Sequence, residues 1–295
     1  MGKGNMRMKH RFSQGIAVLV FAGGLLFVNA ATSMASTAFM LSEGQHRYTT
    51  GIQYATAKDT FDRFRHRVPQ GCTSRDYYWH HSYTYGYSYY LNLFANGGFA
   101  NQSCTGRVKV TGVGDVEVGI RGRLDKFRNG RTWELSAIIP TGYDNQRVNR
   151  LGFGRFGIWG GVNWSTQNTG WEASMPSYWE MGTGLIYWFG APATQTKTFL
   201  KWSWRLDEKG INRIVLGSTL RLSLRDGTRE FLPAAPGVVG FPRFSNDYDE
   251  LTLYAKYSRR LSKQWTVSTT IGNAVWGRNV SASWYGDLAV TYTWD

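Results

Sequence analysis

The stretch Arg75–Phe94, RDYYWHHSYTYGYSYYLNLF, alternates with a period of two residues. From Tyr77 to Leu93 every odd position except His81 is aromatic or aliphatic, whereas most even positions are small or polar. Successive side chains of a β-strand point to opposite faces, while one face of a helix recurs every three or four residues. The stretch therefore predicts strands with one apolar and one polar face.

The same alternation recurs to the end of the chain. In Ile211–Arg225, for example, leucines hold even positions, and arginine, serine and threonine hold odd ones. Short connectors, the first of them at Gly86, alternate with longer ones, as periplasmic turns and outer loops do in outer-membrane barrels. We predict twelve strands, at roughly 46–57, 75–85, 87–97, 113–124, 131–140, 153–164, 178–189, 197–206, 211–225, 248–258, 264–276 and 283–294.

The composition agrees with strands joined by glycine-rich turns. The chain has 295 residues, of which 35 are glycine, 16% are aromatic and 18% are charged. Abundant aromatics argue against disorder, and aromatics together with glycine disfavour helices. The formal net charge of +14 would at first indicate nucleic acid or an acidic surface as a partner.

Part of that charge belongs to a targeting signal. The segment 1–11 carries four basic residues and no acid, Ile16–Val28 is apolar, and Ser33-Met34-Ala35 supplies small residues for cleavage. This order predicts a secretory signal peptide at 1–35 and an exported chain of 36–295. An uncleaved anchor is the alternative. Export removes the reason to expect nucleic acid as a partner.

An exported chain of alternating strands can form an outer-membrane barrel or a soluble β-sandwich. We predict the all-β barrel: a transmembrane, antiparallel, up-and-down β-barrel of about twelve strands. A closed barrel leaves no sheet edge unpaired, and every strand here supplies an outward apolar face. Tryptophan and tyrosine near strand ends, such as Trp79 and Trp265, are typical of interfacial girdles. The sandwich would instead use these aromatics in its core.

Four short glycine-rich motifs now support a family resemblance. They are Gly112–Gly119 (GVGDVEVG), Pro140-Thr141-Gly142, Leu151–Gly154 (LGFG), and the last hairpin from Tyr257 through Gly277-Arg278-Asn279. In this order they resemble a family of outer-membrane transporters named after the meta-pathway of phenol degradation. The likeness covers most of the chain from about Tyr85 onward.

The resemblance implies a transporter-like barrel. Members of the family are linked to uptake of aromatic or other hydrophobic compounds, and some to surface-polysaccharide genes. One feature departs from the usual pattern, because outer-membrane barrels end in an aromatic residue and here Asp295 follows Trp294. The barrel-assembly machinery, an expected partner, would then bind this end more weakly or read Tyr292 and Trp294 instead.

The two cysteines are expected to form a disulfide. Exported proteins with an even cysteine count favour pairing. Cys72 precedes the second predicted strand and Cys104 follows the third, so both lie at the open end of one hairpin. We predict the bond Cys72–Cys104. Two separate thiols are the alternative.

Catalysis is not expected, and neither a cofactor nor a metal is predicted. The adjacent His80 and His81 would point to opposite faces of a strand and cannot share one site. No Gly-x-Ser-x-Gly stretch and no zinc-type spacing of histidine and cysteine stands out.

The predicted inward face is rich in charge. Its candidate lining residues are Glu117, Arg121, Arg123, Arg155, Arg213 and Arg221, with Lys201, Arg205, Glu134 and Glu180 beside them. Two interpretations stay open. These side chains form a solvated ion-pair network that stiffens the interior, or they form a basic constriction that favours anions and aromatic acids.

Two outer loops carry further hypotheses. The loop 58–74 places arginines between aromatic residues, which could contact lipopolysaccharide phosphates or simply be solvated. The loop 226–247 is long, apolar and rich in proline, so we expect it to fold inward as a gate. Its candidate gating residues are Phe231, Pro233, Pro236 and Phe241.

The sequence thus predicts a channel or transporter for passive passage of small hydrophobic or aromatic solutes. The expected partners are outer-membrane lipid, lipopolysaccharide and a small-molecule solute. The alternative function is a non-transport surface component that supports exopolysaccharide export or adhesion.

Overall fold

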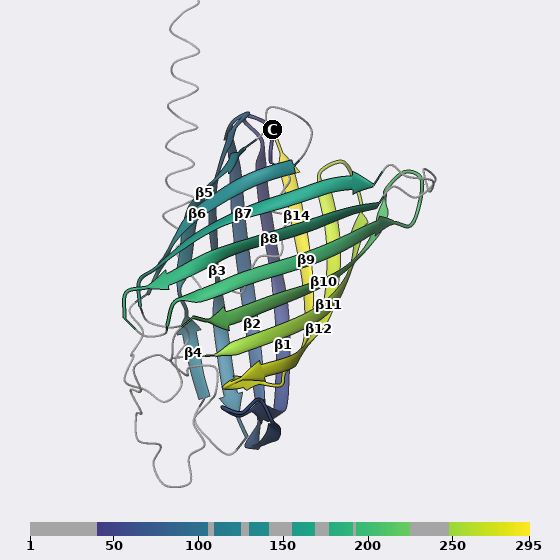
Figure 1. Ribbon diagram of the computed structural model, residues 1–295. Helices are drawn as coiled ribbons and strands as arrows, with labels where there is room; N and C mark the ends of the chain where they lie inside the picture. Colours follow the sequence, from purple (N-terminus) through teal and green to yellow (C-terminus); the bar gives the residue numbers. More distant parts are fainter. Residues whose placement is uncertain are drawn as a thin grey trace, which may run out of the picture.

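The computed structural model describes residues 40–105, 109–124, 130–141, 155–168, 177–190, 193–224 and 248–295. These residues form strands that wind around one axis (Figure 1). The predicted signal peptide, 1–35, lies outside them. In the described part of the chain, no helix has the length and hydropathy of a membrane span.

Twelve antiparallel strands form a closed barrel, which confirms the predicted fold class. They follow one another around the ring in chain order. Two short strands lie beside the ring: β4 (Lys109–Val113) pairs with β3, and β13 (Val280–Ser281) pairs with β1. The strands of the ring are β1 (His46–Phe61), β2 (Arg67–Ser88), β3 (Leu91–Cys104), β5 (Val116–Arg123), β6 (Gly130–Ile139), β7 (Gly157–Asn168), β8 (Ser177–Trp188), β9 (Gln195–Arg205), β10 (Asn212–Ser223), β11 (Asp249–Arg260), β12 (Trp265–Arg278) and β14 (Trp284–Trp294).

The ring closes because β1 pairs along both of its edges. His46 lies opposite Trp294 on β14 and opposite Tyr85 on β2, and the β1–β14 register continues to Thr56 and Trp284. We call the end that holds His46 and Trp294 the terminal end, and the opposite end the distal end.

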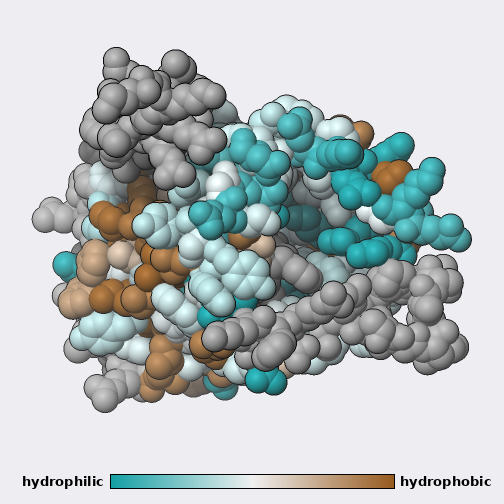
Figure 2. Space-filling view, turned by 90° about the horizontal axis from the view of Figure 1, so that it is seen from above, coloured by the Kyte–Doolittle hydropathy of each residue, from teal (hydrophilic) through white to brown (hydrophobic). Residues whose placement is uncertain are grey.

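The alternation sorts side chains onto two faces of the wall. Outward residues such as Ile52, Trp79, Leu200, Leu216 and Leu288 are between 48% and 60% exposed. The inward positions of the same strands carry mostly polar, charged or aromatic groups. Seen from the terminal end, hydrophobic residues gather on one flank and hydrophilic residues toward the other side (Figure 2). An apolar outer wall around a polar interior is the arrangement that a lipid environment requires.

An aromatic belt runs along the outer face at the terminal end. His46 stacks on Trp294 with ring centroids 5.1 Å apart, and its Nδ1 lies 2.6 Å from the Tyr83 hydroxyl. One step further in, the Tyr48 hydroxyl and His81 Nδ1 form a second contact of 2.6 Å between β1 and β2. Aromatic residues at the end of a barrel are typical of an interfacial girdle, and Trp294 is one of the residues predicted for it.

Inside the barrel, aromatic rings lie across glycines of the neighbouring strand. Each of these rings belongs to a residue directly opposite the glycine that it covers, and a Cβ at the glycine would overlap the ring. Glycine therefore lets the ring lie flat against the wall. The pairs are Phe94 over Gly119, Trp188 over Gly157, Phe199 over Gly182, Tyr254 over Gly217 and Tyr285 over Gly272.

The turn between β2 and β3 lies at Tyr89-Tyr90 and not at Gly86, where it was predicted. Gly86 lies within β2, and its N–H donates to the Gln45 carbonyl over 2.8 Å. Its own carbonyl accepts from the Gly44 N–H, also over 2.8 Å. A Cβ at Gly86 would overlap the backbone of Ser42. Glycine is needed at this position because the N-terminal segment approaches it closely, and not because the chain turns there.

The first distal loop is shorter than predicted. Strands β1 and β2 extend into the segment 58–74 and leave only 62–66 as the turn. Asp62 closes that turn, because its Oδ1 accepts the backbone N–H groups of Phe64 (2.8 Å) and His66 (2.9 Å). The register shifts between Ala57 and Asp59, so the regular period of two is interrupted where the strand continues.

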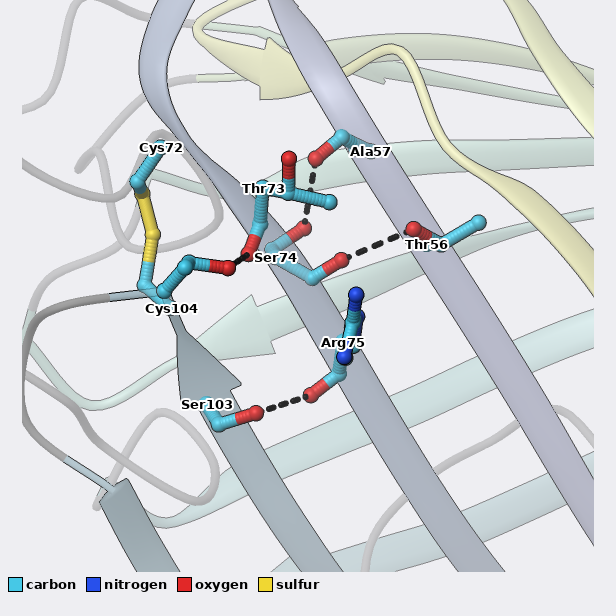
Figure 3. Close-up of a disulfide and its surroundings, with 9 residues drawn as sticks. Thr56, Ala57, Cys72, Thr73, Ser74, Arg75, Ser103 and Cys104 are labelled. Atoms are coloured by element: carbon cyan, nitrogen blue, oxygen red, sulfur yellow. Dashed lines mark hydrogen bonds between the residues drawn. A yellow bond between two sulfur atoms is a disulfide. The ribbon is translucent and has the colours of Figure 1, made fainter.

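The disulfide Cys72–Cys104 is present and joins β2 to β3 at the distal end, as predicted (Figure 3). The two Cα atoms are 5.8 Å apart. Side-chain bonds surround it: the Thr56 hydroxyl donates to the Ser74 carbonyl (3.0 Å), and the Ser103 hydroxyl to the Arg75 carbonyl (3.1 Å). The disulfide therefore fastens the part of the hairpin that extends beyond the rest of the wall.

An aspartate organises the terminal-end turn between β9 and β10. Asp207 accepts hydrogen bonds from the backbone N–H groups of Ile211 (2.8 Å) and Asn212, and Gly210 supplies a positive φ of 61°. The bond from Ile211, followed by that from Asn212, lowers the pKa of Asp207 below its ordinary value.

Replacement of a ring-covered glycine tests the inner packing. In Gly217→Val the new side chain would displace the Tyr254 ring, which should lower the free energy of unfolding by about 1–3 kcal/mol. Gly160→Val is the matched control, since a Cβ at Gly160 meets no atom within 4 Å. Unfolding in detergent is followed by the heat-dependent shift in gel migration. Equal midpoints for the two variants would contradict the packing argument.

Reduction tests the disulfide. The bond closes a loop of 32 residues in sequence separation, which corresponds to a stabilisation of up to about 3–4 kcal/mol. We expect the unfolding midpoint of the oxidised protein to fall on addition of dithiothreitol. The double variant Cys72→Ser/Cys104→Ser should unfold at the reduced midpoint and should not respond to the reagent.

Candidate functional site in the barrel lumen

The inner wall carries a belt of charges from many strands. Across β5–β6 and β8–β9, the register places Glu117, Arg121, Glu134, Glu180 and Lys201 on the inward face. Successive residues of a strand point to opposite faces of the wall. Charged residues can therefore hold inward positions while apolar residues hold the outward positions of the same strands.

Arg121 and Glu134 form the tightest of these ion pairs. The Arg121 Nη2 lies 2.7 Å from Glu134 Oε2, and its Nε donates to the same oxygen over 2.8 Å. The other carboxylate oxygen accepts the indole N–H of Trp159 over 3.0 Å. The guanidinium also lies over the Phe94 ring, 5.2 Å from its centroid. These contacts fix Arg121 against the wall, where it is only 7% exposed.

Glu117 accepts hydrogen bonds from neutral side chains instead of pairing with a cation among the described residues. Its Oε1 accepts from the Ser136 hydroxyl (2.6 Å) and its Oε2 from the Asn96 amide (3.0 Å). Asn96 Oδ1 in turn accepts from the Ser82 hydroxyl over 2.7 Å. These hydrogen bonds connect β2, β3, β5 and β6 across the inner wall.

A second ion pair joins β8 and β9. Lys201 Nζ lies 3.5 Å from Glu180 Oε1, and the Glu180 side chain is fully buried. The Lys201 ammonium also lies over the Phe199 ring, 4.4 Å from its centroid. Arg121, Lys201 and their carboxylates therefore agree with the interpretation of the lumen charges as an ion-pair network.

Two inward cations lack such a pair. Arg221 donates to the Tyr248 hydroxyl over 2.9 Å and is attracted by the nearby Glu250. Lys197 has no hydrogen bond or ion pair with any described residue, and its ammonium lies 5.5 Å from the centroid of the Trp159 ring. The two lie directly opposite one another on β9 and β10. The positive charges of Lys197 and Arg221 are therefore not neutralised by ion pairs with described residues.

The seam of the barrel carries a contact across three strands. His80 on β2 reaches over Gly51 on β1 and places its Nε2 2.7 Å from Asp287 Oδ1 on β14. A Cβ at Gly51 would lie 2.6 Å from that nitrogen. His80 therefore points inward and His81 outward, as their alternation predicted.

An apolar cluster lies on the inner wall beside these charges. It consists of Ile138, Trp159, Ile186 and Trp188, each between 4% and 7% exposed. Next to it lies Gln195, the partner of Ile186 in the register, whose amide is fully buried. Neither polar atom of that amide has a hydrogen-bond partner among the residues that the structure describes.

The remaining predicted lining residues lie nearer the ends. Arg123 lies over the Tyr89 ring at 4.3 Å, and Arg213 over the Tyr178 ring at 5.4 Å. Arg155 lies just before β7 and is exposed. The candidate gating residues Phe231, Pro233, Pro236 and Phe241 lie outside the described residues. Among the described residues, no three or more His, Cys, Asp or Glu side chains gather as a metal site.

Sequence reasoning missed several inward groups. They are Lys197, Glu250, Lys256, Asp287 and the aromatic residues Phe94, Trp159, Tyr254 and Tyr285. The same alternation could have found them, because each holds the inward parity of its strand. A search restricted to arginine-rich faces overlooked strands in which the inward charge is isolated.

No protein-family model and no curated protein sequence matches the chain. Among solved structures, the chain is similar to an outer membrane channel from Pseudomonas putida F1, with a TM-score of 0.68, 12% identity and coverage of 90% of this chain and 100% of that chain. It is also similar to the translocator domain of the autotransporter NalP from Neisseria meningitidis, with a TM-score of 0.47, 12% identity and coverage of 96% and 95%. The first likeness shows that the fold is that of an outer-membrane barrel.

The buried ion pair of β8 and β9 can be tested directly. Lys201→Met leaves the buried Glu180 carboxylate without its cation, so we expect a loss of about 3 kcal/mol in the free energy of unfolding. The double variant Lys201→Met/Glu180→Gln removes both charges and should regain most of that loss. Urea unfolding in detergent measures both. A double variant no more stable than Lys201→Met would argue against the pair.

Proposed function

We propose that the chain is an outer-membrane channel through which small hydrophobic or aromatic solutes pass passively. One observation carries the proposal: the inward residues Thr219 and Thr252, which face one another on β10 and β11, are partly exposed although the barrel closes around them. Space that admits solvent therefore lies beside this part of the inner wall.

The chemistry of the wall supports aromatic solutes in particular. Of the rings held flat over glycines, that of Tyr285 is partly exposed, and lysine ammonium groups lie next to the inward rings of Trp159 and Phe199. A planar solute can stack on such rings, while its polar group meets a charge or a hydroxyl. Neither a purely apolar nor a purely charged lumen would offer both.

The likeness to a solved outer membrane channel supports transport over enzymatic activity. Membership of the phenol meta-pathway family is part of the proposal. Two of its motifs meet in the structure, because the Thr141 hydroxyl contacts the carbonyls of Val113 (3.1 Å) and Gly114 (2.6 Å). Residues of the two motifs thus connect the segment that follows β6 to the segment that precedes β5.

The proposal also orients the barrel. We place the terminal end in the periplasm and the distal end outside the cell, after removal of the signal peptide. At the distal hairpin Arg65 and Arg67 are engaged by Asp249 (3.1 Å) and Asp59 (2.8 Å). Arg63, which lies over the Phe64 ring at 4.5 Å, is the arginine best placed to meet a lipopolysaccharide phosphate.

The end of the chain is proposed to engage the barrel-assembly machinery. Trp294 stacks on Tyr292 with centroids 5.1 Å apart, so this aromatic pair forms the end of β14. Asp295 accepts a hydrogen bond from the Gln45 amide over 3.2 Å. Its carboxylate is thus turned toward the N-terminal segment of the barrel.

Solute flux into vesicles tests the proposed function. Proteoliposomes are placed in isosmotic solutions of phenylalanine or leucine, two zwitterions of similar size that cross bare lipid slowly. We expect swelling with both solutes, and a rate at least about twofold higher with phenylalanine because its ring stacks on the wall. Vesicles with thermally unfolded protein are the control.

Conductance in planar bilayers completes this test. A folded protein that gives neither swelling nor conductance would overturn the proposal and favour the non-transport surface component. Equal rates for phenylalanine and leucine would retain the channel and overturn its preference for aromatic solutes.

A further inference from the structure

We infer that Lys197 and Arg221 form a carboxylate-binding subsite in the lumen, and that the adjacent apolar cluster takes the ring of an aromatic carboxylate. The inference rests on the proposed passage of solutes and names the class of solute that the lumen holds. It starts from two cations that lie directly opposite one another on β9 and β10, on the same inward face.

This juxtaposition is unfavourable without an anion. Directly opposite residues of an antiparallel pair have Cβ atoms about 5 Å apart, and like charges there repel one another. Arg221 and Lys201 repel the Lys197 ammonium, and Glu117 and Glu134 attract it without an ion-pair contact. A carboxylate placed between Lys197 and Arg221 would remove the repulsion and bind both cations.

The two cations also differ from the other lumen cations in their contacts. Arg121 and Lys201 each have a carboxylate within 4 Å, at 2.7 Å and 3.5 Å. Within the described part of the chain, neither Lys197 nor Arg221 has one, although Glu250 is the register partner of Arg221 and attracts it. These two cations can therefore accept an external anion without giving up an ion pair.

A third polar group points to the same ligand. Gln195 precedes Lys197 by two residues on the same face of β9. Its side chain is fully buried, and neither amide atom has a hydrogen-bond partner within the described segments. A buried amide without hydrogen bonds is unfavourable in a folded protein. A carboxylate oxygen held by Lys197 would give the Gln195 amide an acceptor.

The ring of the ligand has a matching surface. Gly161 and Gly184 leave the Trp159 ring flat against the wall, and Gly184 is the register partner of Lys197. Ile186 lies opposite both Trp159 and Gln195 in the register. The cations and the edge of the apolar cluster are thus adjacent in the register, and the Lys197 ammonium lies 5.5 Å from the centroid of the Trp159 ring.

Binding of benzoate to the full chain in detergent micelles tests the inference. Saturation-transfer NMR measures the affinity of benzoate, of benzamide, which lacks the charge, and of cyclohexanecarboxylate, which lacks the aromatic face. We expect benzoate to bind best and benzamide worst. Lys197→Gln should weaken benzoate binding at least about tenfold, as expected for loss of a charge-assisted hydrogen bond, and Lys197→Arg should retain it.

Lys256→Gln is the matched control. Lys256 is an inward lysine of β11 that likewise has no ion pair within the described residues, so its replacement removes the same charge away from the apolar cluster. Its variant should bind benzoate within about twofold of the parent. Equal weakening by Lys197→Gln and Lys256→Gln would overturn the subsite in favour of a general positive potential. The heat-dependent gel shift verifies that each variant is folded.

The binding assay separates this inference from the proposed function. Benzoate binding that depends on Lys197, without solute flux in vesicles, would support the subsite and contradict the channel. Flux without any dependence of benzoate binding on Lys197 would support the channel and overturn the subsite.

Discussion

The pairing of β1 with both β2 and β14 is the constraint on which the rest of the structure depends. In hydrocarbon an unpaired backbone amide has no water to bind, so a sheet can lie there only if its two edges meet. Closure also separates the two faces of the sheet, because a closed sheet turns one face toward its interior and the other toward the surroundings. The outward Ile52 and Leu288 and the inward Asp287 belong to the same seam. His80 and Asp287 then fasten that seam from within, over a glycine that leaves room for their contact.

A closed sheet leaves an interior that its own side chains must shape. Here aromatic rings cover glycines on the neighbouring strands, and this keeps bulky residues against the wall and out of the axis. The ring shields the glycine backbone from solvent. Because glycine has no side chain, the ring can lie flat against it. Charges next to the rings are then held in place, as Arg121 is by Phe94 and Glu134.

The period of two predicted the strands and their outward apolar face. Together with the predicted export signal and the alternating lengths of the connectors, it predicted the barrel and its strand number. It located most strands within a few residues because turns interrupt the alternation. It was wrong at Gly86, since a glycine needed for the close approach of Ser42 looks in sequence like a glycine needed for a turn. It also missed the extension of β1 and β2, where a register shift interrupts the pattern. The disulfide followed from the expected export, the even cysteine count and the hairpin that brings Cys72 and Cys104 to one end. Which inward charges pair, and which do not, depends on the register between strands, and a single strand does not contain that information.

Paired and unpaired charges lie close together on the inner wall. Arg121 and Lys201 are neutralised in contact with Glu134 and Glu180, and this part of the wall is rigid because each member would be costly to leave alone. Lys197 lies on the same strand as Lys201, directly opposite Arg221 on β10, and has no ion pair with any described residue. Its own side chain is partly exposed, so an incoming anion can reach it. The ion-pair network and the basic site are therefore not rival interpretations of the inward charges, because the first holds the wall on which the second is displayed.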